Sequence, residues 1–190
     1  MVSLVELWLP ILLSAVLVFV ASSIIWMFTP LHKHDYKDPG DKEDAILGML
    51  KSATFAPGVY FVPWCHGKEK DPVFIERQKT GPWAQLIVRG SAPDIGKMLG
   101  AWMLHLMLVG VFVAYIASHA GLGPAADYLR VFRIVGTAAF LAYGGYSLPL
   151  CIWHGQPWAQ LPGRLIDGVI YALLTAGTFA WLWPGAPTLP

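Results

Sequence analysis

The stretch Leu7–Phe28 reads LWLPILLSAVLVFVASSIIWMF and contains no charged side chain. A helix needs about 20 mainly apolar residues to cross the hydrocarbon core of a bilayer. Three further stretches of the chain have a similar length and character: Met98–Ala117, Ile134–Trp153 and Arg164–Trp183. The sequence therefore predicts an all-α integral membrane protein with four transmembrane helices.

The first stretch has an alternative interpretation as a cleaved signal peptide. A signal peptide begins with a basic region and has an apolar core of about 7–15 residues. Here Glu6 is the only charge that precedes the stretch, and the apolar run is longer than such a core. We therefore expect an uncleaved anchor helix.

The composition agrees with a membrane protein and excludes several other classes. Hydrophobic residues make up 56% of the 190 residues and charged residues only 13%, against about 25% charged in a typical soluble domain. A net charge of +1 excludes a nucleic-acid binder, which needs a surplus of basic residues. The 9 Trp, 7 Tyr and 9 Phe residues exclude a disordered chain, and 2 Cys exclude a disulfide-dense scaffold or a four-thiolate zinc site.

The positive charges predict how the chain lies in the membrane. Most of the 13 Lys and Arg residues lie in the polar segment 30–97, and Arg164 falls on the same side if the spans alternate. Cytoplasmic loops carry the excess of Lys and Arg. We expect segment 30–97 to be cytoplasmic and the N-terminus, the loop 118–133 and the C-terminus to be outside, an arrangement compatible with a bacterial inner membrane.

Segment 30–97 is predicted to hold short elements and to belong, with the spans, to one membrane domain, 1–190. A short amphipathic helix starts near Asp41, which we expect to cap it, and presents Ala45, Ile46, Met49, Leu50 and Ala53 at helical spacing. Two prolines break 56–64 into an extended or interfacial segment. Residues 73–77 and 83–89 are predicted to form the strands of a small β-hairpin.

Two further expectations concern the ends of the spans. Ser91 or Asp94 is placed to cap the second span, because short polar side chains accept hydrogen bonds from the free N–H groups of a helix start. Pro149 should end or kink the third span, since proline lacks the N–H that continues a helix.

The fourth span carries small residues at every fourth position: Gly168, Ala172, Ala176 and Ala180. Such a stripe lets helix backbones approach closely in lipid. A second row, Asp167, Tyr171 and Thr175, runs beside it. The stripe is predicted to be a helix-packing interface, either inside the bundle or against another subunit.

His105 is the one ionisable side chain of the second span, about 12 Å along the helix from Lys97 at 1.5 Å per residue. Ionisable groups at such depth are uncommon and often functional. Tyr146 and Tyr171 reach a comparable depth, and Asp167 lies one turn nearer the cytoplasm. The predicted intramembrane polar cluster comprises His105, Tyr146, Asp167, Tyr171 and Thr175.

This cluster allows three interpretations. His105 could bind a cofactor such as a porphyrin, could take part in proton or substrate transfer, or could be a neutral imidazole hydrogen-bonded between helices. A bis-histidine haem site lacks a second imidazole, because His119 and His154 fall at opposite membrane surfaces. The cofactor, if one is bound, stays unknown.

The segment His32-Lys33-His34-Asp35 and the pair Cys65-His66 contain side chains that can bind metals. Their spacing differs from that of structural zinc sites, so we expect a solvated loop beside the membrane and no metal site. The sequence also lacks a nucleophile elbow, a phosphate-binding glycine loop and an H-E-x-x-H helix.

These observations favour a non-catalytic subunit of a larger membrane protein complex, with other membrane subunits as partners. Its role would be assembly, stabilisation or docking of those partners, and a respiratory or photosynthetic complex is one natural setting. One alternative is an autonomous membrane redox or cofactor-binding protein that uses His105. Another is a small transporter, for which Asp167, Tyr171 and Thr175 supply only one wall of a polar path.

Overall fold

The computed structural model describes residues 2–185 and is mostly helical. Its contacts divide the chain into two compact units. We call the first, residues 2–36 and 94–185, the membrane unit, and the second, Lys37–Pro93, the polar unit. Most of segment 30–97 makes its contacts within itself, and the single domain 1–190 expected from the sequence stays a prediction.

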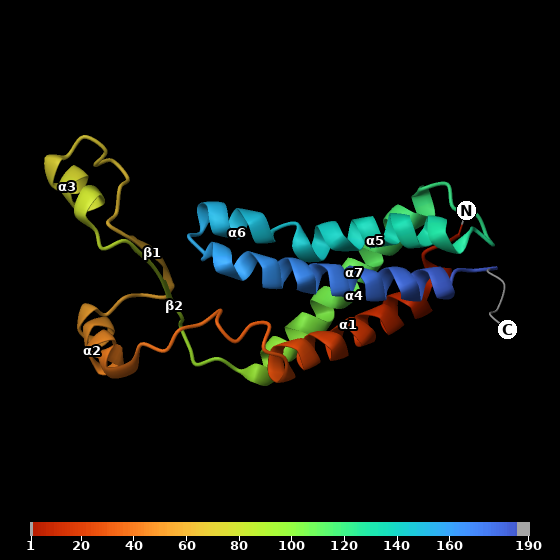
Figure 1. Ribbon diagram of the computed structural model, residues 1–190, viewed down its shortest axis with the longest axis horizontal. Coiled ribbons are helices and arrows are strands. Elements are labelled where there is room, and N and C mark those ends of the chain that lie inside the picture. Colours follow the sequence, from red (N-terminus) through yellow and green to blue (C-terminus); the bar gives the residue numbers. More distant parts are fainter. Residues whose placement is uncertain (1, 186–190) are drawn as a thin grey trace. The chain divides into compact units, whose positions relative to one another are not determined.

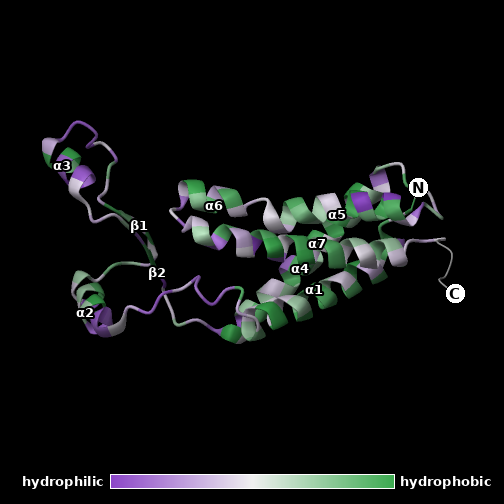
Figure 2. Cartoon of the chain, in the orientation of Figure 1, coloured by the Kyte–Doolittle hydropathy of each residue, from purple (hydrophilic) through white to green (hydrophobic). Residues whose placement is uncertain are grey.

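The membrane unit is a bundle of helices (Figure 1). Its elements are η1 (Val5–Leu7), α1 (Trp8–Phe28), α4 (Ile95–His119), α5 (Tyr128–Gly144), α6 (Ser147–Trp153), η3 (Trp158–Gln160) and α7 (Leu161–Trp181). Three helical segments are long and apolar enough to cross a membrane: Val5–Phe28, Ile95–His119 and Tyr128–Trp153. The chain is therefore an integral membrane protein, and the dominance of apolar residues along α1 is visible in Figure 2.

α7 is not one of these three segments, although its 21 residues equal α1 in length. Arg164 and Asp167 lie in its first half, and charged side chains lower the hydropathy of a candidate span. The four predicted spans thus reduce to three that composition supports.

The third span is interrupted where glycines and a proline follow one another. α5 ends at Gly144, and α6 begins at Ser147. Pro149 lies in the first turn of α6, where its missing N–H breaks no helical hydrogen bond. The kink expected at Pro149 therefore comes before it, because the proline ring would clash with the carbonyl of Gly145 in a continuous helix.

α5 and α7 lie side by side (Figure 1) and approach each other very closely. A Cβ added to Gly168 would lie 2.9 Å from the Cα of Gly144, and one added to Gly136 would lie 3.3 Å from the Cβ of Ala176. The stripe Gly168, Ala172, Ala176 and Ala180 is buried throughout. In this structure the stripe packs inside the bundle, with Gly168 and Ala176 against α5.

α1 completes the bundle by packing against both α4 and α7. Its buried side chains include Ala15, Val18 and Ile25, which share an apolar cluster with Leu106 of α4 and Tyr171 of α7. The N-terminal half of α1 also passes close to α4, because a Cβ on Gly110 would lie 3.1 Å from Ile11. At its N-terminus, α4 is capped by Asp94, whose side chain accepts a hydrogen bond of 3.1 Å from the Lys97 N–H. Of the two predicted candidates, Ser91 and Asp94, the structure thus confirms Asp94.

The polar unit contains η2 (Gly40–Lys42), α2 (Glu43–Ala53), β1 (Gly58–Val62), α3 (Pro72–Thr80) and β2 (Ala84–Val88). The short helix predicted near Asp41 is present as α2. Its predicted cap is wrong, because Asp41 lies inside η2 and the N-cap position belongs to Lys42, which makes no side-chain capping bond. The 3-10 turn moves the start of the α-helix beyond the reach of the Asp41 side chain.

The predicted hairpin between residues 73–77 and 83–89 is also wrong. Residues 73–77 are helical, because Asp71 caps α3 by accepting a hydrogen bond from the Val73 N–H and Pro72 occupies the first helical position. β2 lies within the predicted second strand, but it pairs antiparallel with β1, in the register Val59 opposite Ile87. The segment predicted only as extended therefore supplies the partner strand.

The contact between α5 and α7 leads to a stability prediction. Gly168→Ala should lower the free energy of unfolding by about 1–3 kcal/mol, because the added methyl group meets the backbone of Gly144, which cannot rotate away. Gly177→Ala on the same helix is the matched control, since its nearest neighbour is the Tyr128 hydroxyl at 3.9 Å. Unfolding of both variants in detergent, followed by circular dichroism, measures the difference. Equal stability of the two variants would contradict the close packing.

Candidate functional site

The structure separates the residues of the predicted intramembrane cluster. His105 lies on an exposed face of α4, where its ring stacks on Trp102 at a centroid distance of 5.4 Å. Tyr146 is exposed too, and its hydroxyl lies 3.1 Å from Nε2 of His154. Side chains at the same depth on neighbouring helices meet only if each helix turns them toward the bundle interior. They do not: α4 instead turns Leu106, Val109 and Val113 to the core.

Asp167, Tyr171 and Thr175 form one buried row along α7. The Thr175 hydroxyl donates a hydrogen bond of 2.8 Å to the Tyr171 carbonyl, and the Tyr171 ring makes edge contacts with Trp102 and Tyr143. Aromatic packing and a local hydrogen bond thus account for most of this row. These contacts do not involve Asp167. Its partner lies in the segment after α1, which the sequence predicts to be a solvated loop.

That partner is His32, whose side chain is only 4% exposed. Its Nδ1 lies 2.8 Å from Oδ2 of Asp35, and its Nε2 lies 3.0 Å from Oδ2 of Asp167. The ring also stacks on Trp26 with a centroid distance of 3.9 Å and an angle of 5°. We call His32, Asp35 and Asp167 the buried triad. The prediction that His32 and Asp35 lie in a solvated loop is therefore wrong, because their side chains are only 4% and 10% exposed.

Local hydrogen bonds shape the turn after α1 so that His32 lies against α7. α1 ends at Phe28, and the Thr29 hydroxyl donates to the Ile25 carbonyl at 2.6 Å. The turn that follows is closed by the Asp35 N–H, which donates to the His32 carbonyl at 3.1 Å. His32 can approach α7 because residue 163 is glycine, where a Cβ would lie 3.3 Å from the ring.

A second set of contacts holds the triad from the start of α7. The Gln160 amide donates to the Asp35 carbonyl at 2.5 Å, and the Arg164 guanidinium donates to Oε1 of Gln160 at 2.7 Å and of Gln156 at 3.2 Å. Arg164 thereby brings a positive charge to the helix end that carries Asp167. The loop after α1 and the start of α7 are joined by charge and by hydrogen bonds between residues far apart in the sequence.

The triad connects α7 to the loop that follows α1. Nε2 of His32 is at ion-pair distance from Asp167, but its N–H is not aligned for a hydrogen bond, and Oδ1 of Asp167 has no partner among residues 2–185. Within the same residues, no group of three His, Cys, Asp or Glu side chains could hold a metal ion. The triad therefore supplies a buried polar contact, 3.0 Å between Nε2 of His32 and Oδ2 of Asp167, that joins the end of α1 to α7.

The polar unit presents apolar side chains at its surface. On one face of the two-stranded sheet lie Val59, Phe61 and Ile87, which are 55%, 46% and 67% exposed. We call these three residues the ribbon patch. In α2 the apolar side chains of Ile46, Leu47 and Met49 are likewise exposed. Among the described residues of this unit, Phe74 is the single buried apolar side chain.

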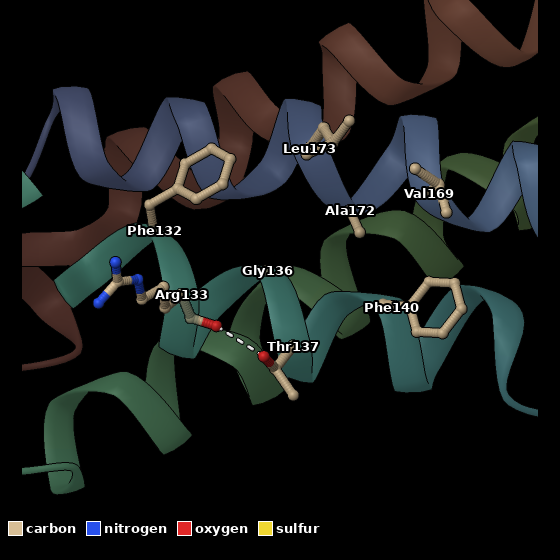
Figure 3. Close-up of a pocket in the computed structure, with 8 residues that line it drawn as sticks. All are labelled: Phe132, Arg133, Gly136, Thr137, Phe140, Val169, Ala172 and Leu173. Carbon is tan, nitrogen blue, oxygen red and sulfur yellow. Dashed lines mark hydrogen bonds between the residues drawn. The ribbon is translucent and has the colours of Figure 1, made fainter. Parts of the chain in front are cut away.

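An open groove of about 350 Å³ lies between α5 and α7 in the membrane unit (Figure 3). It is lined by Phe132, Arg133, Gly136, Thr137, Phe140, Val169, Ala172 and Leu173. These side chains are apolar except for Arg133 and Thr137, and the Thr137 hydroxyl is bonded to the Arg133 carbonyl. The groove exists because Gly136 and Ala172 leave space between larger neighbours.

Comparisons with protein-family models, with curated proteins and with solved structures find no match to this chain. Sequence reasoning missed the triad because His32 lies in a polar stretch with two lysines and two aspartates close by. The one available signal was the polar Asp167 in an otherwise apolar helix, which needs a buried partner.

The triad leads to a prediction about His32. His32→Ala should lower the free energy of unfolding by roughly 1–3 kcal/mol, because it leaves the buried carboxyl group of Asp167 without the imidazole beside it. His34→Ala is the matched control, since His34 lies two residues away and is exposed. Thermal unfolding of both variants in the same detergent measures the effect. An unchanged midpoint for His32→Ala would show that the contact between His32 and Asp167 contributes nothing to stability.

Proposed function

We propose that this chain is a non-catalytic subunit of a larger membrane protein complex and that its polar unit docks onto a partner. The observation that carries the proposal is the surface of the polar unit, which exposes the ribbon patch and the apolar side chains of α2 while burying only Phe74 among the described residues. Contiguous apolar surface of this kind is typical of protein interfaces.

Elementary stability arguments support a partner for this unit. An isolated two-stranded sheet is at best marginally stable in water, and it needs a further strand or a packed helix. Here β1 and β2 form the whole sheet, and Val59 and Ile87 are paired across it with both side chains exposed. A partner that covers this face would bury the pair and stabilise the sheet.

The polar side chains of the membrane unit support a structural role. The buried triad joins α1 to α7, and the Tyr171 and Thr175 row is engaged in packing and local hydrogen bonds. The alternative of a redox protein at His105 has less support, because His105 is exposed and, among residues 2–185, stacks on Trp102 alone. A transporter needs a polar path, and the buried row is packed against neighbouring rings.

The proposal includes four membrane crossings, with α7 as the fourth. α7 packs along α5, and α5 with α6 forms one of the apolar candidate spans. A helix packed lengthwise beside a spanning helix lies at the same depth. The Arg164 and Asp167 charges lie near the start of α7, where the triad and the glutamines engage them. We place residues 37–93 in the cytoplasm and the chain in a bacterial inner membrane, following the excess of Lys and Arg in segment 30–97.

Membership of a complex predicts the native mass of the protein. Extracted from its own membrane in mild detergent, the 20.8 kDa chain should migrate in an assembly with stoichiometric partners. Ile87→Asp should release it, because a carboxylate on the ribbon patch is costly to bury in an interface. Ser91→Asp places the same charge at an exposed polar position outside the patch and should leave the assembly intact. A lone monomer or homodimer for the wild-type protein would overturn the proposal.

Four crossings predict opposite locations for two reporter fusions. Green fluorescent protein fused after residue 155, in the loop between α6 and η3, should fluoresce in a bacterial host, because this loop is cytoplasmic in the proposed topology. The same reporter fused to the C-terminus should be dark, and alkaline phosphatase at that position should be active. Both fusion points on the same side of the membrane would mean that α7 does not cross.

A further inference from the structure

The groove between α5 and α7 (Figure 3) is built by the absence of side chains on its floor. Gly136 of α5 and Ala172 of α7 lie at its centre, with Phe132 at one end and Phe140 and Val169 at the other. From Arg133 to Phe140 the helix rises about 10 Å. The groove is thus a short apolar channel along the bundle surface, parallel to the helices.

One end of this groove carries a cation, Arg133, that has no counter-ion among the described residues. Arg133 is exposed, and none of the salt bridges or side-chain hydrogen bonds within residues 2–185 involves its guanidinium. Arg130, one turn earlier, is also without a carboxylate partner in that range. The nearest acid in the sequence, Asp127, caps α5 by accepting a hydrogen bond of 3.1 Å from the Arg130 N–H.

Another interfacial cation of the membrane unit behaves differently. Lys97, in the first turn of α4, lies 3.7 Å from the carboxylate of Asp94. The guanidinium of Arg133 is therefore available to bind an anionic group from outside the described residues. Its planar guanidinium matches the oxygens of a phosphate group.

We propose that this groove binds an anionic phospholipid from the leaflet in which α5 begins. One acyl chain would lie along Gly136 between α5 and α7, and Arg133 would hold the headgroup phosphate, with Arg130 and the positive N-terminal end of α5 adding to the attraction. This inference rests on the membrane crossing of α7 proposed above, and it goes beyond membership of a complex.

The shape of the groove favours an acyl chain over a helix from a partner. Close helix docking in lipid uses a smooth surface of small residues. Here the aromatic rings of Phe132 and Phe140 and the exposed side chain of Leu173 border the channel. The smooth stripe on α7 is already buried in the bundle, with Gly168 and Ala176 against α5. A narrow and flexible ligand fits between such borders more readily than a rigid helix does.

The test uses the full purified chain in detergent and counts bound lipids by native mass spectrometry. Dioleoyl phosphatidylglycerol is added at equal concentration to dioleoyl phosphatidylcholine, which has the same acyl chains and no net charge. We expect the wild-type protein to retain the anionic lipid preferentially. Arg133→Gln should reduce this retention about fivefold, as expected for the loss of one basic contact with an anionic headgroup.

Two further variants separate the groove from general charge effects. Leu173→Trp, at an exposed border position, should reduce retention of both lipids by narrowing the channel without disturbing the core. Lys97→Gln removes an interfacial cation elsewhere and should retain the wild-type preference. Added inorganic phosphate should not displace the lipid, since the acyl chain contributes to binding.

Several outcomes would overturn the inference. These are equal retention of the two lipids by the wild-type protein, an unchanged preference in Arg133→Gln, or displacement by inorganic phosphate. Photocrosslinking from residue 173 in the native membrane that captures a protein helix in place of lipid would also overturn it. Because lipid retention is measured on the isolated chain, its result is independent of the native mass, and the reporter fusions test the crossing of α7 separately.

Discussion

In hydrocarbon, helices gain little from burying one leucine against another, so the contact between α5 and α7 depends on how closely their backbones approach. Gly168 and Gly144 allow that approach, because neither carries a side chain that would hold the helices apart. The rest of the membrane unit follows from this contact. It fixes the rotation of α7, which turns Asp167 toward the loop after α1, and it leaves the surface groove at Gly136 about two turns from the closest packing at Gly144.

The rotation of α7 creates an electrostatic demand that another part of the chain satisfies. A carboxylate buried at the start of a membrane helix is costly unless it is paired. His32 supplies the pairing, with Asp35 on its other ring nitrogen and Trp26 against its face. The triad thereby ties α1 to α7 at one end of the bundle, while Ile11 and Gly110 bring α1 against α4 nearer the other end. Polar contacts thus hold α1 at one end of the bundle, and close packing holds it nearer the other end.

Exposed apolar side chains have different consequences in the two units of the chain. In the membrane unit, exposed apolar side chains face lipid and need no partner. In the polar unit, the ribbon patch of Val59, Phe61 and Ile87 lies on a two-stranded sheet that is too small to be stable by itself. This contrast connects the proposed docking role with the polar unit and the proposed lipid contact with the membrane unit.

The sequence by itself predicted the membrane class, the first three of its four spans, the short helix α2, Asp94 as one of two candidate caps of α4 and the small-residue stripe of α7, because each depends on residues that are near one another in the chain. It did not determine the strand pairing, since residues 73–77 have the side chains of a strand but follow the helix start signal Asp71-Pro72. Only the tertiary structure decided which polar residues meet. Depth along a helix can be counted from the sequence, but the direction in which a side chain points depends on how each helix is rotated by its packing. For that reason His105 lies at the bundle surface, whereas His32, in a polar stretch, is buried against Asp167.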